Sequence, residues 1–411
     1  MIVFAWDGFP QYAARCVGAF VRTTTEKVVV VATRPTVPIE GMEKLCGCPV
    51  HWIDGDGLFD LRLFDCLIGR EGERITLFVA GWKVPAFNRL RDQVRAKGGR
   101  IICMLDNNMT GRGLFDLGFR DCLIEIVKAL RFRLSLRKHF DGFIVPGRAG
   151  RRLLRFYGVP DGKIFEGFYA ADESLFTPGP AIEDRPKKII YVGQLCERKN
   201  VRRLVEAFHE SFKVERLKGF KVERLKGFKV SKFQSRKVSG IQSFRGEGLK
   251  GFEDGEWSLE LYGSGPLKEE LNQTIKQSNN QTIHLHDFLQ PEELAAKYRE
   301  ARIFCLPSLE EHWGVVVQEA ALSGCALLLS NRVGAKEDFL EEGVNGLSFD
   351  PYSVEDMAEK FAEAMTRTFE TKTAAEKARE MGVKRFVKAV ERFQGFRVSK
   401  FQSFKVSRLK G

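Results

Sequence analysis

The sequence has no long hydrophobic run, few histidines and no set of paired cysteines. No stretch of about 18 apolar residues occurs, so no membrane-spanning helix is predicted. The first residues lack the basic start and the cleavage site of a signal peptide. The nine cysteines are odd in number and scattered, and Cys46-Gly-Cys48 has no second pair at zinc-ligand spacing. These absences favour a cytoplasmic protein without a structural zinc site.

The positive charge of the chain is concentrated in an octapeptide repeat. The net charge is +12, yet residues 212–252 repeat the pattern FKVERLKG and hold twelve Lys or Arg against three Glu. Residues 396–411 repeat it again with five positive charges, which leaves about −2 for the rest. No recognisable nucleic-acid module surrounds the repeats, so no specific nucleic acid is expected. They are interpreted either as an expansion without a role or as an arm that contacts anionic lipid.

The length and the hydrophobic content of 44% favour two domains, each with its own core. In the N-terminal half, short apolar runs alternate with helical patterns, which predicts a Rossmann-like parallel sheet. The strands expected there are residues 1–6, 27–32, 49–53, 75–80, 100–105 and 140–145. A linker rich in Pro and Gly, FTPGPAIEDRPKK, follows this half and marks a domain boundary.

The most informative segment is residues 303–330, IFCLPSLEEHWGVVVQEAALSGCALLLS. Its pattern predicts a buried strand, a loop, a helix that begins after Gly314 and ends at Gly324, and a second buried strand. This is a building block of a parallel sheet. Glu311 falls in the loop and Glu319 about one turn into the helix. The two carboxylates are therefore expected on either side of the helix start.

The chemistry of this helix start suits a nucleotide sugar. The amides of Gly314, Val315 and Val316 have no partner within the helix, and a helix start carries partial positive charge. Such amides bind phosphate, while the carboxylates of Glu311 and Glu319 can accept hydrogen bonds from hydroxyl groups. A diphosphate, a ribose and a hexose present this combination of groups.

This segment resembles the E-x7-E signature of retaining glycosyltransferases of family 4, which have the GT-B fold. The resemblance extends from about Ile189 to about Ala362. Within it, IIYVGQLCERKN resembles the first strand and phosphate loop of the family, and LELYGSGPLKEEL resembles its Gly-x-Gly-Pro turn. TIHLHDFLQPEELAAKYREA and GAKEDFLEEGVNGLSF resemble later blocks, so five blocks occur in the order of the family.

The resemblance implies an α/β protein with two Rossmann-like domains that face a central cleft, with a repetitive basic insertion in the second. The expected parts are an acceptor domain (1–175), a linker (176–187), a nucleotide-sugar domain (188–365) with the insertion 212–252, C-terminal helices (366–395) that could return to the first domain, and a basic tail (396–411). The insertion follows a helix expected at 201–209. It should therefore project from the edge opposite the ligand crevice.

The resemblance also implies roles for individual residues. Glu311 would bind the hexose, Glu319 the ribose hydroxyls, and Lys199 the departing diphosphate. The family commonly has an Arg where this chain has Gln194, and Arg198 is expected to supply that charge.

The remaining candidates come from the other loops. Gly263, in the Gly-x-Gly-Pro turn, and Gly8, after the first strand, would approach the donor. Asp106 would contact an acceptor hydroxyl, although a capping turn explains it equally well. Asp54 and Asp56 form a DxD that is interpreted as a turn and not as a metal site, and no histidine is assigned as a base.

These observations predict a metal-independent retaining hexosyltransferase of the cytoplasm that needs no cofactor. It would move a hexose from a nucleotide-diphosphate sugar to a saccharide or lipid-linked acceptor, with peripheral contact to the inner face of an anionic membrane as an option. A sugar-nucleotide epimerase of similar architecture is one alternative. A non-catalytic membrane- or nucleic-acid-binding protein on a degenerate transferase fold is the other.

Overall fold

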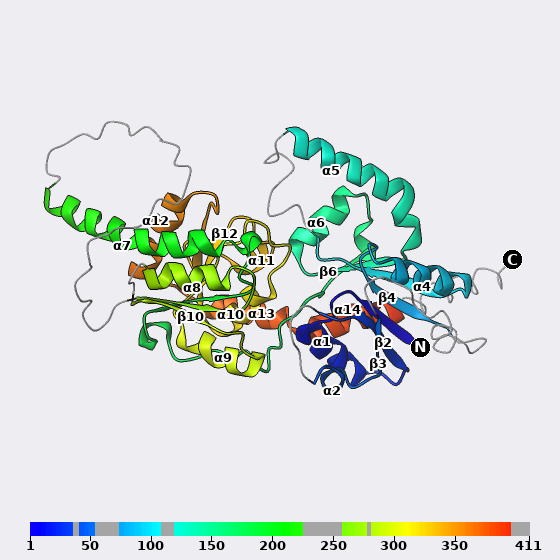
Figure 1. The fold of residues 1–411 in the computed structure, drawn as a ribbon. Coiled ribbons are helices and arrows are strands. Elements are labelled where there is room, and N and C mark those ends of the chain that lie inside the picture. Colours follow the sequence, from blue (N-terminus) through cyan, green and yellow to red (C-terminus); the bar gives the residue numbers. More distant parts are fainter. Residues whose placement is uncertain (36–40, 54–73, 108–118, 225–256, 278–280, 396–411) are drawn as a thin grey trace.

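The computed structural model describes residues 1–35, 41–53, 74–107, 119–224, 257–277 and 281–395 (Figure 1). These residues form two α/β domains, each built on one parallel sheet. No helix in this part of the chain is long and apolar enough to cross a membrane. The DxD turn at 54–56, the repeats from residue 225 and the tail at 396–411 lie outside the described residues.

The N-terminal domain contains a seven-stranded sheet in the order β3-β2-β1-β4-β5-β6-β7. All six strands expected from the sequence are present. The seventh, β7, has only three residues, too few for a recognisable pattern. The strands are β1 (Ile2–Trp6), β2 (Val28–Thr33), β3 (Val50–Ile53), β4 (Thr76–Ala80), β5 (Arg100–Met104), β6 (Gly142–Val145) and β7 (Ile164–Glu166).

Helices cover both faces of this sheet. Successive strand residues such as Val3 and Phe4 contribute to opposite core layers, as the two-residue period of a strand requires. One layer is closed by α4 (Pro85–Ala96), α5 (Phe119–Arg131), the π-helical turn η2 (Phe132–Leu136) and α6 (Arg148–Phe156). The other is closed by α1 (Gln11–Val21), α2 (Met42–Cys46) and α14 (Val383–Gly395).

The C-terminal domain contains a six-stranded sheet in the order β10-β9-β8-β11-β12-β13. Its strands are β8 (Lys188–Val192), β9 (Ser258–Tyr262), β10 (Ile283–His286), β11 (Ile303–Leu306), β12 (Ala326–Ser330) and β13 (Gly346–Phe349). Its helices are α7 (Val201–Arg224), α8 (Lys268–Gln277), α9 (Pro291–Glu300), α10 (Val315–Leu322), α11 (Lys336–Phe339), α12 (Val354–Thr366) and α13 (Lys372–Glu380).

The helix after β8 is longer than expected. The prediction ended it at residue 209, but α7 continues to Arg224 and so includes the start of the repeats. The first repeat has no proline and only one glycine, and a single glycine in a helix costs only about 1 kcal/mol. The octapeptide is therefore compatible with helix where a preceding helix has already begun.

Each sheet reverses its strand order at one place. In the N-terminal sheet this switch point lies between β1 and β4, and in the C-terminal sheet it lies between β8 and β11. Loops at the carboxyl ends of such neighbouring strands separate to opposite sides and leave a crevice between them, where ligands of doubly wound sheets bind. The fold therefore marks two crevices, one in each domain.

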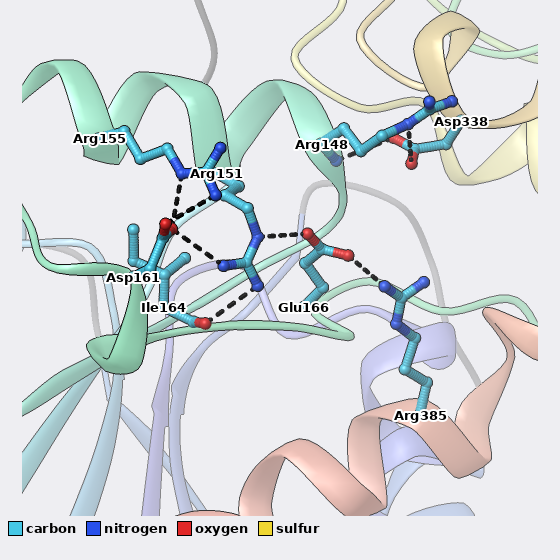
Figure 2. Close-up of polar contacts among 8 residues, drawn as sticks. All are labelled: Arg148, Arg151, Arg155, Asp161, Ile164, Glu166, Asp338 and Arg385. Carbon is cyan, nitrogen blue, oxygen red and sulfur yellow. Dashed lines mark hydrogen bonds and ion pairs between the residues drawn. The ribbon is translucent and has the colours of Figure 1, made fainter.

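The last helix joins the C-terminal end of the chain to the N-terminal domain. Phe386 and Val390 of α14 are fully buried against α1 and the N-terminal sheet. On the neighbouring edge, Glu166 of β7 lies between Arg385 of α14 and Arg151 of α6 and accepts a hydrogen bond from each (Figure 2). A mixed apolar and ionic contact thus fixes α14 to the first domain.

Candidate active site

The loop after β8, residues 193–200, is held against the loop after β9. The amide of Leu195 donates to the carbonyl of Ser264 at 2.9 Å. A Cβ atom on Gly263 would lie 1.9 Å from the carbonyl oxygen of Gly193. Only glycine fits at position 263, and this close packing of two loops is the geometry that requires it.

The loop after β11 is fixed by the neighbouring loop after β12. The backbone of Glu311 donates to the carbonyl of Arg332 at 3.3 Å and accepts from the amide of Gly334 at 2.9 Å. Gly314 then takes a φ of +91°, a conformation that favours glycine, and α10 begins at Val315. The helix starts where the sequence predicted.

The carboxylate of Glu311 is surrounded by cationic and polar groups from both loops. It contacts the ammonium of Lys199, lies 3.5 Å from the guanidinium of Arg198 and accepts from the hydroxyl of Ser308 at 3.4 Å. Burial acts to raise the pKa of Glu311, but Lys199 and Arg198 outweigh it, so this pKa lies below its usual value. Glu311 is therefore ionised at neutral pH.

The two cations differ in their surroundings. Lys199 is buried, with its side chain 10% exposed, whereas the side chain of Arg198 is 47% exposed. Arg198 also donates to the carbonyl of Glu310 at 2.7 Å, which orients it along the loop. Lys199 is the cation that the fold places within the crevice between β8 and β11.

The start of α10 leaves its amides available. No side chain caps the helix at Gly314, and the first turn has no acidic residue. In the described part of the chain, no group accepts a hydrogen bond from the amides of Gly314, Val315 or Val316. Three donors and the positive end of the helix dipole therefore lie beside the Lys199–Glu311 pair.

Glu319 lies in a different environment from Glu311. Its carboxyl group accepts a hydrogen bond from the hydroxyl of Tyr298 at 3.2 Å, and no described cation pairs with it. Burial raises the pKa of Glu319 to about 7. A carboxyl group that has lost water and gained only one hydrogen bond has unused capacity to bind hydroxyl groups.

Asp106 approaches this site from the N-terminal domain. It follows β5 and is close enough to Glu311 and His312 for their charges to affect its ionisation. Burial is the main reason that the pKa of Asp106 lies above its usual value. Glu311 adds to this effect, and His312 opposes it. The structure therefore brings Asp106 of the N-terminal domain near the loop that carries Glu311 and His312.

Gly8 lies at the other crevice, between β1 and β4. Its φ is +60°, but its amide donates to the hydroxyl of Thr33 at 2.6 Å, and that hydroxyl donates to Asp7 at 2.7 Å. The amide of Gly8 already has an acceptor, so it differs from the amides that begin α10. A cavity of about 500 Å³ opens beside it, lined by Asp7, Thr33, Arg34, Ile53, Lys83, Val84 and Pro85.

The sequence did not identify an aromatic group between the domains. Tyr12 of α1 packs edge to face against Tyr169 at 5.2 Å, and its pKa is raised by burial and by the nearby charge of Asp106. Tyr169 has a φ of 58°, which is unusual for a residue other than glycine. Its carbonyl accepts a hydrogen bond from the indole of Trp313 at 3.1 Å. The positive φ leaves no trace in a single sequence.

An ion pair and a hydrogen bond between amide side chains connect the two domains. Arg148, at the start of α6, pairs with Asp338 of α11 through its side chain and its amide, both at 3.1 Å (Figure 2). The amide side chain of Gln11 donates to that of Gln290 at 3.0 Å. These contacts join the N-terminal and C-terminal domains.

Comparisons with known proteins bear on the fold and on the family of one segment. Residues 246–381 match the family model described as glycosyl transferases group 1. A 2-deoxystreptamine N-acetyl-D-glucosaminyltransferase of Niallia circulans is 26% identical over 27% of this chain and 29% of its own length. A sulfoquinovosyl transferase of Arabidopsis thaliana is 32% identical over 26% of this chain and 20% of its own length. The chain thus spans less than a third of either relative.

Solved structures resemble the chain over nearly its whole length. Anabaena HepE, solved with UDP and glucose, covers 96% of this chain and 99% of its own, with a TM-score of 0.63 and 12% identity. Sucrose-phosphate synthase of Thermosynechococcus elongatus covers 96% and 98%, with a TM-score of 0.62 and 15% identity. The chain therefore has the GT-B fold of glycosyltransferases, and its segment 246–381 matches group 1 of these enzymes.

Proposed function

We propose that this protein is a retaining glycosyltransferase that moves a hexose from a nucleotide-diphosphate sugar to a saccharide or lipid-linked acceptor. One observation carries the proposal. At the crevice between β8 and β11, the fold assembles a buried lysine, three available amides and two carboxyl groups. The pKa of one, Glu311, is lowered, and the pKa of the other, Glu319, is raised to about 7. The similarity of residues 246–381 to group 1 glycosyl transferases supports it.

The diphosphate would bind between Lys199 and the start of α10. Both groups are fixed before the donor arrives, since Glu311 holds the ammonium of Lys199 and Gly314 sets the direction of the helix. As the bond to the sugar breaks, negative charge increases on the departing phosphate. Donors that are already oriented stabilise that charge without reorganisation.

The carboxylates would hold the two sugar rings. Among the described residues, Tyr298 alone donates to the carboxyl group of Glu319, which would accept further hydrogen bonds from the ribose hydroxyls. Glu311 is ionised and would accept from a hexose hydroxyl while its charge favours the positive anomeric centre. Asp106, across the cleft, would orient the acceptor hydroxyl.

The reaction proposed is an exchange at the anomeric carbon on one face of the sugar. The bond from the anomeric carbon to the phosphate oxygen breaks, and a bond from the acceptor oxygen forms on the same side. The proton of the acceptor hydroxyl passes to the departing phosphate oxygen. This scheme needs no protein nucleophile and no metal, so addition of EDTA should leave turnover unchanged.

The stereochemistry of the product tests the proposal. A purified enzyme given an α-linked nucleotide sugar and an acceptor should release an α-linked product, visible by NMR of the anomeric proton. A β-linked product would contradict retention. Omission of the acceptor should prevent formation of any new sugar. Conversion of the donor without an acceptor would instead favour the epimerase.

A further inference from the structure

The helix α5 and the turn η2 expose apolar side chains on their outer face. Ala129 and Phe132 face inward, and Phe132 packs against Trp82, Phe143 and Tyr157. Among the described residues, nine large apolar side chains are strongly exposed, and six of them lie within this one stretch. These six, between 39% and 81% exposed, are Leu123, Ile124, Ile126, Val127, Leu130 and Leu134.

The spacing of these side chains makes them one continuous surface. Leu123, Val127, Leu130 and Leu134 follow one another at intervals of four, three and four residues, which places them on one side of a helix. Single exposed apolar residues are ordinary, but a contiguous patch of this kind marks an interaction surface. In Figure 1, α5 lies on the outer side of the N-terminal domain, away from α14 and from the C-terminal sheet.

Basic side chains border this surface. Residues 119–138 contain six Lys or Arg against two acidic residues. Within the described residues, Arg120, Arg131, Arg137 and Lys138 are exposed and belong to no ion pair. Of the two acidic residues, Glu125 is half-buried and already occupied by Lys128 and the hydroxyl of Tyr157, while Asp121 in the first turn is exposed and offsets one of these cations. The surface is therefore apolar along its centre and cationic at its borders.

We propose that the outer face of α5 and η2 docks on an anionic lipid surface, with its aliphatic side chains inserted into one leaflet. A helix of this design lies in the plane of the interface, where apolar residues enter the acyl region and Lys or Arg contact anionic headgroups. The proposal does not depend on the reaction assigned to the cleft. It also differs from a lipid contact through the octapeptide repeats.

Two features favour lipid over a protein partner. The exposed apolar side chains are all aliphatic, whereas the residues that dominate protein interfaces are Trp, Tyr and Arg in pockets. The surface is also a single projecting helix, which suits a fluid leaflet. Unpaired cations on its borders match the negative potential of that leaflet.

Binding of the full chain to vesicles tests the proposal. Cosedimentation with vesicles of phosphatidylcholine plus phosphatidylglycerol should exceed that with phosphatidylcholine alone. The quadruple variant Leu123→Ser, Val127→Ser, Leu130→Ser, Leu134→Ser should bind the anionic vesicles at least about tenfold more weakly, because insertion strength scales with buried apolar area. Its melting temperature should fall by only a few degrees, since all four side chains are at least half exposed and Ser costs only a fraction of a kcal/mol per site in helix propensity.

Two matched variants separate this surface from other sources of binding. Phe288→Ser with Val344→Ser, which removes exposed apolar groups of the C-terminal domain, should leave vesicle binding unchanged. Replacement of residues 225–252 by a Gly/Ser linker should retain most of it. If the linker variant loses binding while the quadruple variant keeps it, the repeats are the lipid contact and the proposal is wrong.

Hydrogen exchange locates the contact directly. Anionic vesicles should slow exchange of the amides of residues 119–136 in the wild-type chain. Unchanged exchange there would overturn the proposal. So would a wild-type dimer that the quadruple variant converts to monomer without any effect on vesicle binding, because the face would then join two copies of the chain.

Discussion

The two crevices of this molecule have the same topology but different contents. At the switch point between β8 and β11, Lys199 and Glu311 are already paired, and the start of α10 presents its amides. At the switch point between β1 and β4, a cavity of about 500 Å³ is open, and its Arg34 and Lys83 have no ion-pair partner in the described part of the chain. The charged groups of the first site are already paired, whereas the cations of the second site would pair only with groups of a bound ligand.

This difference fits the proposed division between a donor site and an acceptor site. A nucleotide diphosphate has fixed geometry, so a rigid set of loop contacts can recognise it. Acceptors vary in size and charge, and an open cavity with few internal bonds can change its lining without loss of stability. Changes to the C-terminal crevice should therefore affect turnover and donor binding most. Changes on the N-terminal side should affect acceptor recognition.

The largest effect is expected from Glu311→Gln. This change preserves the shape of the side chain but removes a negative charge. That charge holds Lys199 and would stabilise the positive charge that develops at the anomeric carbon. We expect kcat to fall at least about 100-fold, a loss of roughly 2.7 kcal/mol of transition-state stabilisation. The control is Glu310→Gln, whose side chain is 49% exposed and lies 3.8 Å from His312, its one ion-pair partner among the described residues. Normal turnover of Glu311→Gln at saturating donor would refute the assignment.

Next comes the effect of pH on stability at Glu319. Its pKa is about 7 in the folded chain and 4.5 when unperturbed, so the unfolded state loses its proton first as pH rises. Folding stability from this group is present below pH 4.5 and is lost between pH 4.5 and about 7. Glu319→Gln removes this loss and should stabilise the free protein by about 2 to 3 kcal/mol above pH 7 but little at pH 4.5.

Denaturant unfolding at several pH values measures this difference between the variant and the wild type. An equal effect at pH 4.5 and pH 8 would show that the carboxyl group of Glu319 does not titrate as its burial implies.

A third comparison separates Lys199 from Arg198. Lys199→Ala removes a buried charged contact and should weaken donor binding roughly 10- to 150-fold, with a loss of turnover as well. Arg198→Ala removes a half-exposed cation and should cost no more than about fivefold. Titration calorimetry with the donor and steady-state kinetics measure both. If Arg198→Ala is the more damaging, the roles of the two residues are exchanged.

The smallest expected effect lies on the acceptor side. Asp106→Asn should raise the KM for the acceptor about 2- to 10-fold, the contribution of one hydrogen bond, and should leave the KM for the donor unchanged. A rise in the donor KM alone would place Asp106 in the donor site and would remove the contrast between the crevices.

Local patterns were sufficient to predict most of the backbone geometry at the crevice between β8 and β11. The strand, loop and helix around Glu311 and Glu319 occur within one short segment, so their relative positions follow from helix geometry and from the glycine at 314. The pairing of Lys199 with Glu311 joins residues over a hundred positions apart. Only the resemblance to family 4 placed them in one site.

Three features could not be predicted from local pattern. The contact between Tyr169 and Trp313 depends on the relative placement of two domains and on an unusual φ at Tyr169. The outward orientation of the apolar side of α5 contradicts the usual rule that such a side faces the core. The length of α7 depends on a helix extending into a repeat whose own pattern is ambiguous.

Donor binding tests the central claim most directly. Stabilisation of the wild-type chain should be measured with UDP-, GDP- and ADP-sugars, since a donor at 100 times its Kd should add about 2.7 kcal/mol to the free energy of unfolding. One class of nucleotide sugar should give this increase, and Glu319→Ala should weaken its binding roughly 10- to 150-fold while remaining folded. If no nucleotide sugar stabilises the wild type, or if folded Glu319→Ala binds the donor normally, the crevice between β8 and β11 is not a nucleotide-sugar site.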